Sequence, residues 1–390
     1  MQGMIRTLAA AAAAVLLAAA PTGAALAQGD IVIGSVLSLT GPGASLGIPE
    51  RNTIELLPTS IAGRKIRYIV LDDATDTTTA VRNARKLITE DRVDVIIGPT
   101  VTPTSLALLE VIGPAETPMI SLAGSGVIAF PVEGNKRWSF KLAPNEPLMA
   151  ARVFEHATNN NVKTIAYIAF ANAFGESFTA EMRKVGELRK VQTVAHEKFN
   201  PTDTSVTPQV LKVLSLNPDA VLIAASGTPA ATPVIELRRR GYKGIIYLNQ
   251  GVANNDFLRV GGKELEGALF SVSPVLVAEQ LPDSNVIKKV AMDYVKRYEA
   301  KFGAGSRTLF GATAWDAWLI LERAIPIALK TAQPGTVEFR RALRDAIEST
   351  RDLVGTQAVF NLSPTDHSGG DQRGQVLVQI KDGKWKLVAQ

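Results

Sequence analysis

Residues Val95 to Ser105 read V-I-I-G-P-T-V-T-P-T-S. A short apolar run ends at a Gly-Pro pair, and apolar residues then recur at helical spacing. This pattern predicts a buried strand, a tight turn and the start of a helix. The first turn of that helix carries the hydroxyls of Thr100, Thr102, Thr104 and Ser105. Because the first amides of a helix lack internal partners and are positively polarised, these hydroxyls either cap the helix or help to bind a carboxylate or phosphate.

The strand–turn–helix pattern recurs along most of the chain. Apolar runs near 31–39, 65–71 and 119–122 alternate with segments of helical spacing, and after a pause near Lys141 a second series runs from 146 to 251. Strands that alternate with helices of 10–15 residues imply parallel βαβ units. The second series repeats the first in order and spacing, so the sequence predicts an α/β fold with two lobes of similar build.

The last third of the chain has a different pattern. After Ser273-Pro274 it predicts three helices, at 286–302, 311–330 and 337–349. Residues 359–360 and 375–380 are predicted to form closing strands, and Lys381-Asp382-Gly383-Lys384 is predicted to form a hairpin turn.

The N-terminal segment has the pattern of a secretory signal peptide. It carries a positive charge at Arg6, an Ala/Leu-rich apolar stretch at 8–20 and Ala25-Leu26-Ala27 before Gln28. We expect cleavage after Ala27 and export to the periplasm. No later stretch approaches the ~20 apolar residues of a membrane span.

Composition excludes several kinds of protein. The 390 residues contain no cysteine, which rules out thiol chemistry and thiolate metal sites. The formal net charge is +5, and basic residues are interleaved with acidic ones. We therefore expect no nucleic-acid partner.

Parallel sheets bind ligands beyond the carboxyl ends of their strands. Six loops occupy that place, and they contain no cluster of ionisable residues: 40–47, 99–105, 121–126, 171–175, 225–228 and 249–253.

Two catalytic alternatives arise from these loops. Residues 43–47 fit G-x-S-x-G, which would make Ser45 the nucleophile of a secreted hydrolase with Asp366 and His367 as partners. The glycines at 41, 43 and 47 resemble a dinucleotide loop, but their spacing is one residue too long.

Histidines 156, 196 and 367 lack the spacing of a metal site, and we expect each at the surface or in a cap. No cofactor and no metal are expected.

Five motifs together resemble the periplasmic solute-binding proteins of ABC importers, in the branched-chain amino acid (Leu/Ile/Val-binding) family. They are I-G-S-V-L-S-L-T-G-P from Ile33, L-D-D-A-T-D from Leu71, V-I-I-G-P from Val95, P-M-I-S from Pro118 and F-G-E-S-F from Phe174. Their order on the βα plan covers nearly the whole chain after residue 27.

This resemblance implies the type I periplasmic binding protein fold, in which two Rossmann-like lobes are joined by three hinge crossings. The crossings are expected near Lys141, near Ser273 and at 355–360. Residues 28–143 plus 274–355 would form the N-terminal lobe, and residues 144–273 plus 356–390 the C-terminal lobe. The protein would be a monomer that delivers a small molecule to an ABC permease and performs no catalysis.

The resemblance also implies a set of ligand-binding residues. Thr102, with Thr100 beside it, would seat the ligand carboxylate, helped by Ala123 and Ser125 in the next loop. Phe174 would form an aromatic wall. The remaining positions differ from those of amino-acid binders, which carry an aromatic residue at Leu46, a tyrosine near Ser226 and an acidic residue at Gln250.

The missing acidic residue is the one that would receive an amino group. The stretch 40–52, T-G-P-G-A-S-L-G-I-P-E-R-N, is similar to a sub-branch that binds aromatic acids. We therefore expect the ligand to be an aromatic carboxylate or a 2-oxo acid, and an aliphatic amino acid is the alternative.

Overall fold

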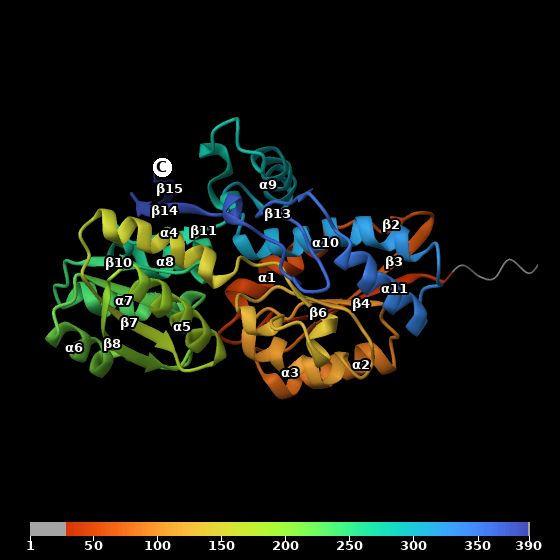
Figure 1. Ribbon diagram of the computed structural model, residues 1–390, viewed down its shortest axis with the longest axis horizontal. Coiled ribbons are helices and arrows are strands. Elements are labelled where there is room, and N and C mark those ends of the chain that lie inside the picture. The colour runs from red at the N-terminus through yellow and green to blue at the C-terminus, as the bar shows by residue number, and fades with distance from the viewer. Residues whose placement is uncertain (1–28, 389–390) are drawn as a thin grey trace, which may run out of the picture.

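The computed structural model describes residues 29–388, so the predicted signal peptide and its cleavage site lie outside the described part. The described chain forms two α/β lobes that lie side by side (Figure 1). Each lobe has its own mainly parallel sheet between layers of helices, which confirms the predicted fold class.

The first sheet has the strand order β2-β3-β1-β4-β5-β6. Its strands are parallel except β2, which pairs antiparallel with β3. Their bounds are β1 Ile31–Leu37, β2 Ser60–Ile61, β3 Arg64–Asp72, β4 Val95–Ile97, β5 Met119–Ser121 and β6 Ser139–Lys141.

Helices and one small hairpin surround this sheet. The helices are α1 Ala44–Ile54, α2 Thr77–Thr89, α3 Thr102–Ile112, α10 Leu309–Ala328 and α11 Val337–Glu348, with the 3-10 turns η1 Gly126–Ile128 and η2 Gly134–Trp138. Strands β12 Leu353–Val354 and β13 Val359–Phe360 pair antiparallel.

The second sheet has the order β15-β14-β11-β10-β9-β7-β8. Strands β7 Thr164–Phe170, β8 Gln192–Phe199, β9 Ala220–Ala224, β10 Ile245–Tyr247 and β11 Leu269–Val272 are parallel, and β14 Val376–Lys381 and β15 Lys384–Leu387 close the sheet antiparallel. Asp382 and Gly383 both have positive φ, as a two-residue hairpin turn of type I′ requires, so the predicted hairpin is confirmed.

The helices around the second sheet are α4 Glu146–Asn159, α5 Ala173–Leu188, α6 Thr207–Ser215, α7 Ala231–Arg239 and α8 Asn255–Gly261. Helix α9 Lys288–Phe302 instead packs against α1, where Tyr294 shares a hydrogen bond with Thr53 and Tyr298 accepts one from Asn52. Short 3-10 segments complete this part: η3 Thr228–Ala230, η4 Gln250–Val252, η5 Gly262–Leu265, η6 Pro274–Gln280 and η7 Gln372–Gly374.

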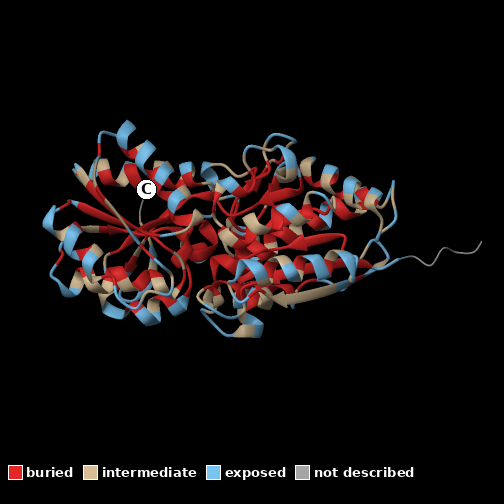
Figure 2. Ribbon diagram, turned by 90° about the horizontal axis from the view of Figure 1, so that it is seen from below, coloured by how far each residue is buried: buried red, intermediate tan, exposed pale blue. Residues whose placement is uncertain are grey.

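Burial follows the sheets (Figure 2). All seven residues of β1 and all five of β9 are buried, because helices cover both faces of a parallel sheet. These strands therefore appear in the sequence as continuous apolar runs rather than alternating ones, which is why they could be predicted.

Helix α1 begins earlier than its sequence predicts. The spacing of apolar residues predicts a helix from Pro49 to Leu57, but the helix starts at Ala44, ends at Ile54 and includes that proline. The amides of Leu46 and Gly47 already donate to the Gly43 carbonyl, at 2.9 and 3.1 Å. At Gly47 a Cβ atom would lie 2.1 Å from the Ser38 carbonyl oxygen, so this glycine lets α1 pack directly against the end of β1.

The chain leaves the first sheet after β6 and enters the second at β7. The passage is fixed by Lys141, which is fully buried and whose Nζ donates to the carbonyls of Ala143 and Pro144 and to Asn145 Oδ1, at 2.6, 2.9 and 2.9 Å. Burial lowers the pKa of Lys141 to about 8, against the opposing attraction of Glu146.

The chain leaves the second sheet after β11 and returns to it at Val376, the first residue of β14. The hairpin β12–β13, where the sequence placed the last crossing, contributes Phe360 to the core of the first lobe, together with the neighbouring Ala358 and Leu362. The division of the chain into two moving lobes and the rotation about these passages remain predictions.

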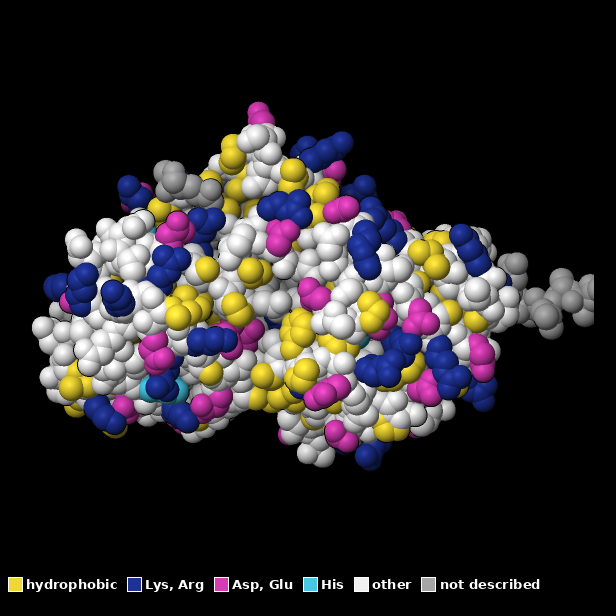
Figure 3. Space-filling view, viewed as in Figure 1, with side chains coloured by type: hydrophobic (Ala, Val, Ile, Leu, Met, Phe, Trp, Pro, Cys, Tyr) yellow, Lys and Arg dark blue, Asp and Glu magenta, His cyan; other side chains and the backbone are white. Residues whose placement is uncertain are grey.

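The surface seen in Figure 3 mixes basic and acidic side chains without a large area of one sign. Among residues 29–388, no helix has both the length and the apolar character needed to cross a membrane.

Candidate functional site

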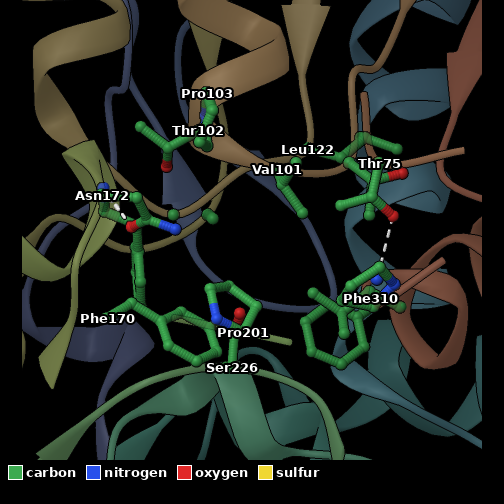
Figure 4. A pocket seen from close by; sticks show the side chains of 18 of the residues that line it. Thr75, Val101, Thr102, Pro103, Leu122, Phe170, Asn172, Pro201, Ser226 and Phe310 are labelled. Carbon is green, nitrogen blue, oxygen red and sulfur yellow. Dashed lines mark hydrogen bonds between the residues drawn. The ribbon is translucent and has the colours of Figure 1, made fainter. Parts of the chain in front are cut away.

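A cavity of about 280 Å³ lies between the two lobes (Figure 4). All six loops that follow the strand ends contribute to its wall. Its lining residues are Pro42, Gly43, Leu46, Thr75, Thr100, Val101, Thr102, Pro103, Leu122, Gly124, Ala143, Phe170, Asn172, Phe174, Pro201, Thr202, Ser226, Gln250, Gly251, Leu309, Phe310 and Thr313.

The loop before α3 and the first residue of α3 each supply one hydroxyl to this wall. The two hydroxyls differ in whether they are free to bind a ligand. Thr100 Oγ1 is already engaged, because it accepts from the Ser38 amide at 3.0 Å and donates to Glu50 at 2.5 Å. Thr102 Oγ1 is buried without a partner among the described residues, and Val101 gives the helix no side-chain cap. A ligand oxygen near Thr102 could therefore accept a hydrogen bond from a hydroxyl that has no other partner, next to helix amides that no side chain caps.

Gln250 lies on the second lobe, in η4 after β10. Its side chain is 3% exposed, and its Oε1 atom has no partner among the described residues. The neighbouring Asn249 holds the loop in place: its Nδ2 donates to the carbonyls of Ile223 and Ala225, and its Oδ1 accepts from the Gly251 amide. Ser226 comes from the adjacent loop and also lines the cavity.

The two lobes meet around the cavity, and two glycines allow the approach. A Cβ atom at Gly227 would lie 2.9 Å from Leu46 Cδ1 of the other lobe. A Cβ atom at Gly124 would lie 3.1 Å from the Phe174 ring, again across the lobes. Leu46 and Phe174 are both buried and line the cavity, and their contact with a ligand stays a prediction.

Ala123 and Ser125 do not line the cavity. The Ser125 hydroxyl donates to Ser177 Oγ of the other lobe at 2.7 Å, and Ser177 in turn donates to Glu146 at 2.7 Å. Glu146 also accepts from the Gly126 amide. Ser125 therefore takes part in a contact between the lobes, while Thr100, Thr102, Leu46, Phe174, Ser226 and Gln250 share the cavity.

Sequence reasoning missed several cavity residues. Phe310 and Thr313 come from the first turns of α10, a helix that enters far along the chain and carries no local signal for a site. Phe170 ends β7, and Pro201 and Thr202 follow β8. Asn172 also lines the cavity, in a loop that the sequence analysis singles out without naming this residue.

No charged side chain lines the cavity among the described residues. The nearest acids are buried behind the wall, where Glu50 accepts from Thr100, and Asp73 accepts from Ser38 at 2.7 Å. Burial raises the pKa of Glu50 well above its ordinary value, with the Thr100 hydrogen bond opposing and the Asp73 charge adding to the shift. Burial likewise raises the pKa of Asp73.

The residues of the hydrolase alternative are not arranged for catalysis. His367, expected at the surface or in a cap, is fully buried and stacked on Phe140, with ring centroids 4.1 Å apart. Its two ring nitrogens bond to the Ser139 carbonyl and to Glu348, so neither is free for Ser45. Ser45 Oγ has no partner among the described residues. Within residues 29–388 no group of three or more metal-ligating side chains comes together.

Comparisons with known proteins agree with this architecture. Residues 30–384 match a family model described as periplasmic binding protein. Leu/Ile/Val-binding protein homolog 3 of Brucella melitensis is 22% identical over 257 residues, which are 64% of this chain and 68% of that protein.

Two solved structures are also similar. An extracellular ligand-binding receptor from Rhodopseudomonas palustris HaA2 is 42% identical, with a TM-score of 0.89 over 93% of this chain and 100% of that one. A solute-binding protein of an ABC transporter from R. palustris, solved with benzoate, shares the fold at 19% identity, with a TM-score of 0.79 over 93% and 96% of the two chains. These relatives are binding proteins rather than enzymes. The chain therefore belongs to the periplasmic binding protein family and has the type I fold.

Proposed function

We propose that the protein captures a small aromatic carboxylate or 2-oxo acid in the cavity between its lobes and delivers it to an ABC permease. The observation that carries this proposal is the cavity wall, which combines aromatic and aliphatic side chains with neutral polar groups and, within residues 29–388, has no charged lining residue. The lobes close on the ligand and release it by opening.

The balance of charges favours an acid over an amino acid. A ligand carboxylate can accept from the unused Thr102 hydroxyl and from the uncapped amides at the positive end of α3. An ammonium group would find no carboxylate to pair with among the described residues that line the cavity, and an unpaired buried charge costs several kcal/mol. Gln250 can accept from a hydroxyl or donate to a keto oxygen.

The aromatic part of the ligand is proposed from the rings around it. Phe174, Phe170 and Phe310 all line the cavity, and aromatic rings stack or meet edge-to-face at little cost. The benzoate complex of the R. palustris protein supports the same ligand class. The alternative, an aliphatic amino acid, is supported by the Leu/Ile/Val-binding relative.

The place of action follows from the family. Periplasmic binding proteins are exported, and cleavage after Ala27, a monomeric state and a permease partner remain part of the proposal.

A thermal-shift screen tests the ligand class. Benzoates, hydroxycinnamates and aryl 2-oxo acids are compared with the twenty amino acids on the mature protein. A ligand at 100 times its dissociation constant stabilises the native state by about 2.7 kcal/mol, which gives a clear rise in melting temperature. We expect that rise with at least one aromatic acid. A rise with leucine, isoleucine or valine and with none of the acids would favour the alternative.

A further inference from the structure

The orientation of the Asn172 amide is fixed by the helix that it precedes. Asn172 is the N-cap of α5, and its Oδ1 accepts from the amides of Phe174 and Gly175, both at 3.1 Å. Only the oxygen of an amide can accept two N–H groups, so Nδ2 is the other, donating end. Asn172 lines the cavity, and no described side chain or carbonyl accepts from its Nδ2 (Figure 4).

A second unused group faces the same part of the cavity from the opposite lobe. Thr102 lines the cavity and is only 1% exposed as a residue. Its Oγ1 atom has no hydrogen-bond partner among the described residues. In Figure 4 the Thr102 hydroxyl and the Asn172 amide point toward the same space. Helices α3 and α5, which begin at these residues, are in contact across the lobes.

We infer that Asn172 is a ligand-binding residue that supplies the second lobe's half of the carboxylate seat. Its Nδ2 donates to one carboxylate oxygen, and the Thr102 hydroxyl donates to the other. This inference rests on the proposed function, and it names a residue that makes the cavity prefer an acid to an amino acid. Because the two donors come from different lobes, an anion at this place holds the lobes together, and the positive ends of α3 and α5 both favour it.

The variant Asn172→Asp separates ligand binding from helix capping. Aspartate caps a helix as well as asparagine does, and a negative charge suits a helix N-terminus, so the fold is retained. The donor that faces the cavity becomes a carboxylate oxygen, which repels a ligand anion and attracts an ammonium. We expect phenylpyruvate to bind about tenfold or more weakly, while the melting temperature of the unliganded protein stays the same or rises.

The decisive readout is the ratio of affinities for phenylpyruvate and phenylalanine, measured by titration calorimetry. Asn172→Asp should lower this ratio by at least about tenfold, because the new charge acts on the two ligands in opposite directions. Asn172→Ser keeps a capping oxygen, but its shorter side chain lacks the Nδ2 group and adds no charge, so it should weaken phenylpyruvate binding by a smaller factor. In the control Asn254→Asp, which changes the N-cap of α8 away from the cavity lining, the ratio should not change.

The outcomes distinguish this inference from the function on which it rests. If wild type prefers phenylalanine, the proposed function is wrong. If wild type prefers phenylpyruvate but Asn172→Asp keeps the wild-type ratio, the function stands and Asn172 is only a cap.

Discussion

Replacing Thr102 by valine is expected to weaken binding of an aromatic acid roughly 10- to 100-fold, because a hydrogen bond to a charged group contributes about 1.5–3 kcal/mol. Valine has nearly the shape of threonine, and the hydroxyl that it removes has no partner among the described residues. The melting temperature of the unliganded protein should therefore not fall. Titration calorimetry and a melting curve measure the two quantities separately.

Thr104→Val is the matched control for this change. Thr104 lies in the same helical turn and is fully buried, but it does not line the cavity, and its hydroxyl donates to the Val101 carbonyl at 3.0 Å. Its loss should lower the melting temperature and leave affinity nearly unchanged. If Thr102→Val binds the acid as tightly as wild type, Thr102 belongs to the fold and not to the carboxylate seat.

The second large effect concerns stability and pH. Burial raises the pKa of Glu50 well above its ordinary value, so the folded protein retains a proton that the unfolded chain releases above about pH 4.3. Stability is therefore fully present below that pH and falls as pH rises toward the folded pKa. Glu50→Gln has no proton to lose. The stability of the variant should therefore rise relative to that of wild type between pH 4 and pH 7.5, and the two proteins should be about equally stable at pH 4.

The readout is the difference in free energy of unfolding between variant and wild type, followed across pH. A difference is needed because burial also raises the pKa of Asp94 to about 6 and of Asp316 to about 7, which lowers wild-type stability over the same range. Glu55→Gln is the control, since Glu55 is an exposed residue at the end of the same helix. A Glu50→Gln advantage that is equal at pH 4 and pH 7.5 would contradict a proton held by Glu50.

Much of this architecture can be predicted from sequence, and the reason is physical. Strands such as β1 and β9 are buried on both faces and appear as continuous apolar runs, and the helices between them have helical spacing. Ligand sites in parallel sheets lie at strand ends, so the loops containing Thr102, Phe174 and Gln250 could be chosen without coordinates.

The features that sequence did not give depend on contacts between distant segments. Phe310 joins the cavity only because α10 returns to the first lobe. Ser125 lies outside the cavity lining, and its hydroxyl donates a hydrogen bond to Ser177 in a helix of the other lobe. His367 is buried because its ring stacks on Phe140 and its Nε2 atom is hydrogen-bonded to Glu348. None of these pairings has a local pattern in the chain.

The preference for an acid over an amino acid is the central claim, and titration calorimetry of matched ligands tests it most directly. Phenylpyruvate is compared with phenylalanine, and 4-methyl-2-oxopentanoate with leucine, on the same preparation of mature protein. Because the cavity has no lining carboxylate among the described residues, even ~1.4 kcal/mol of unpaired-charge cost makes each 2-oxo acid bind at least about tenfold more tightly. Tighter binding of the amino acid in both pairs would contradict the role given to Gln250 and make the protein an amino-acid binder.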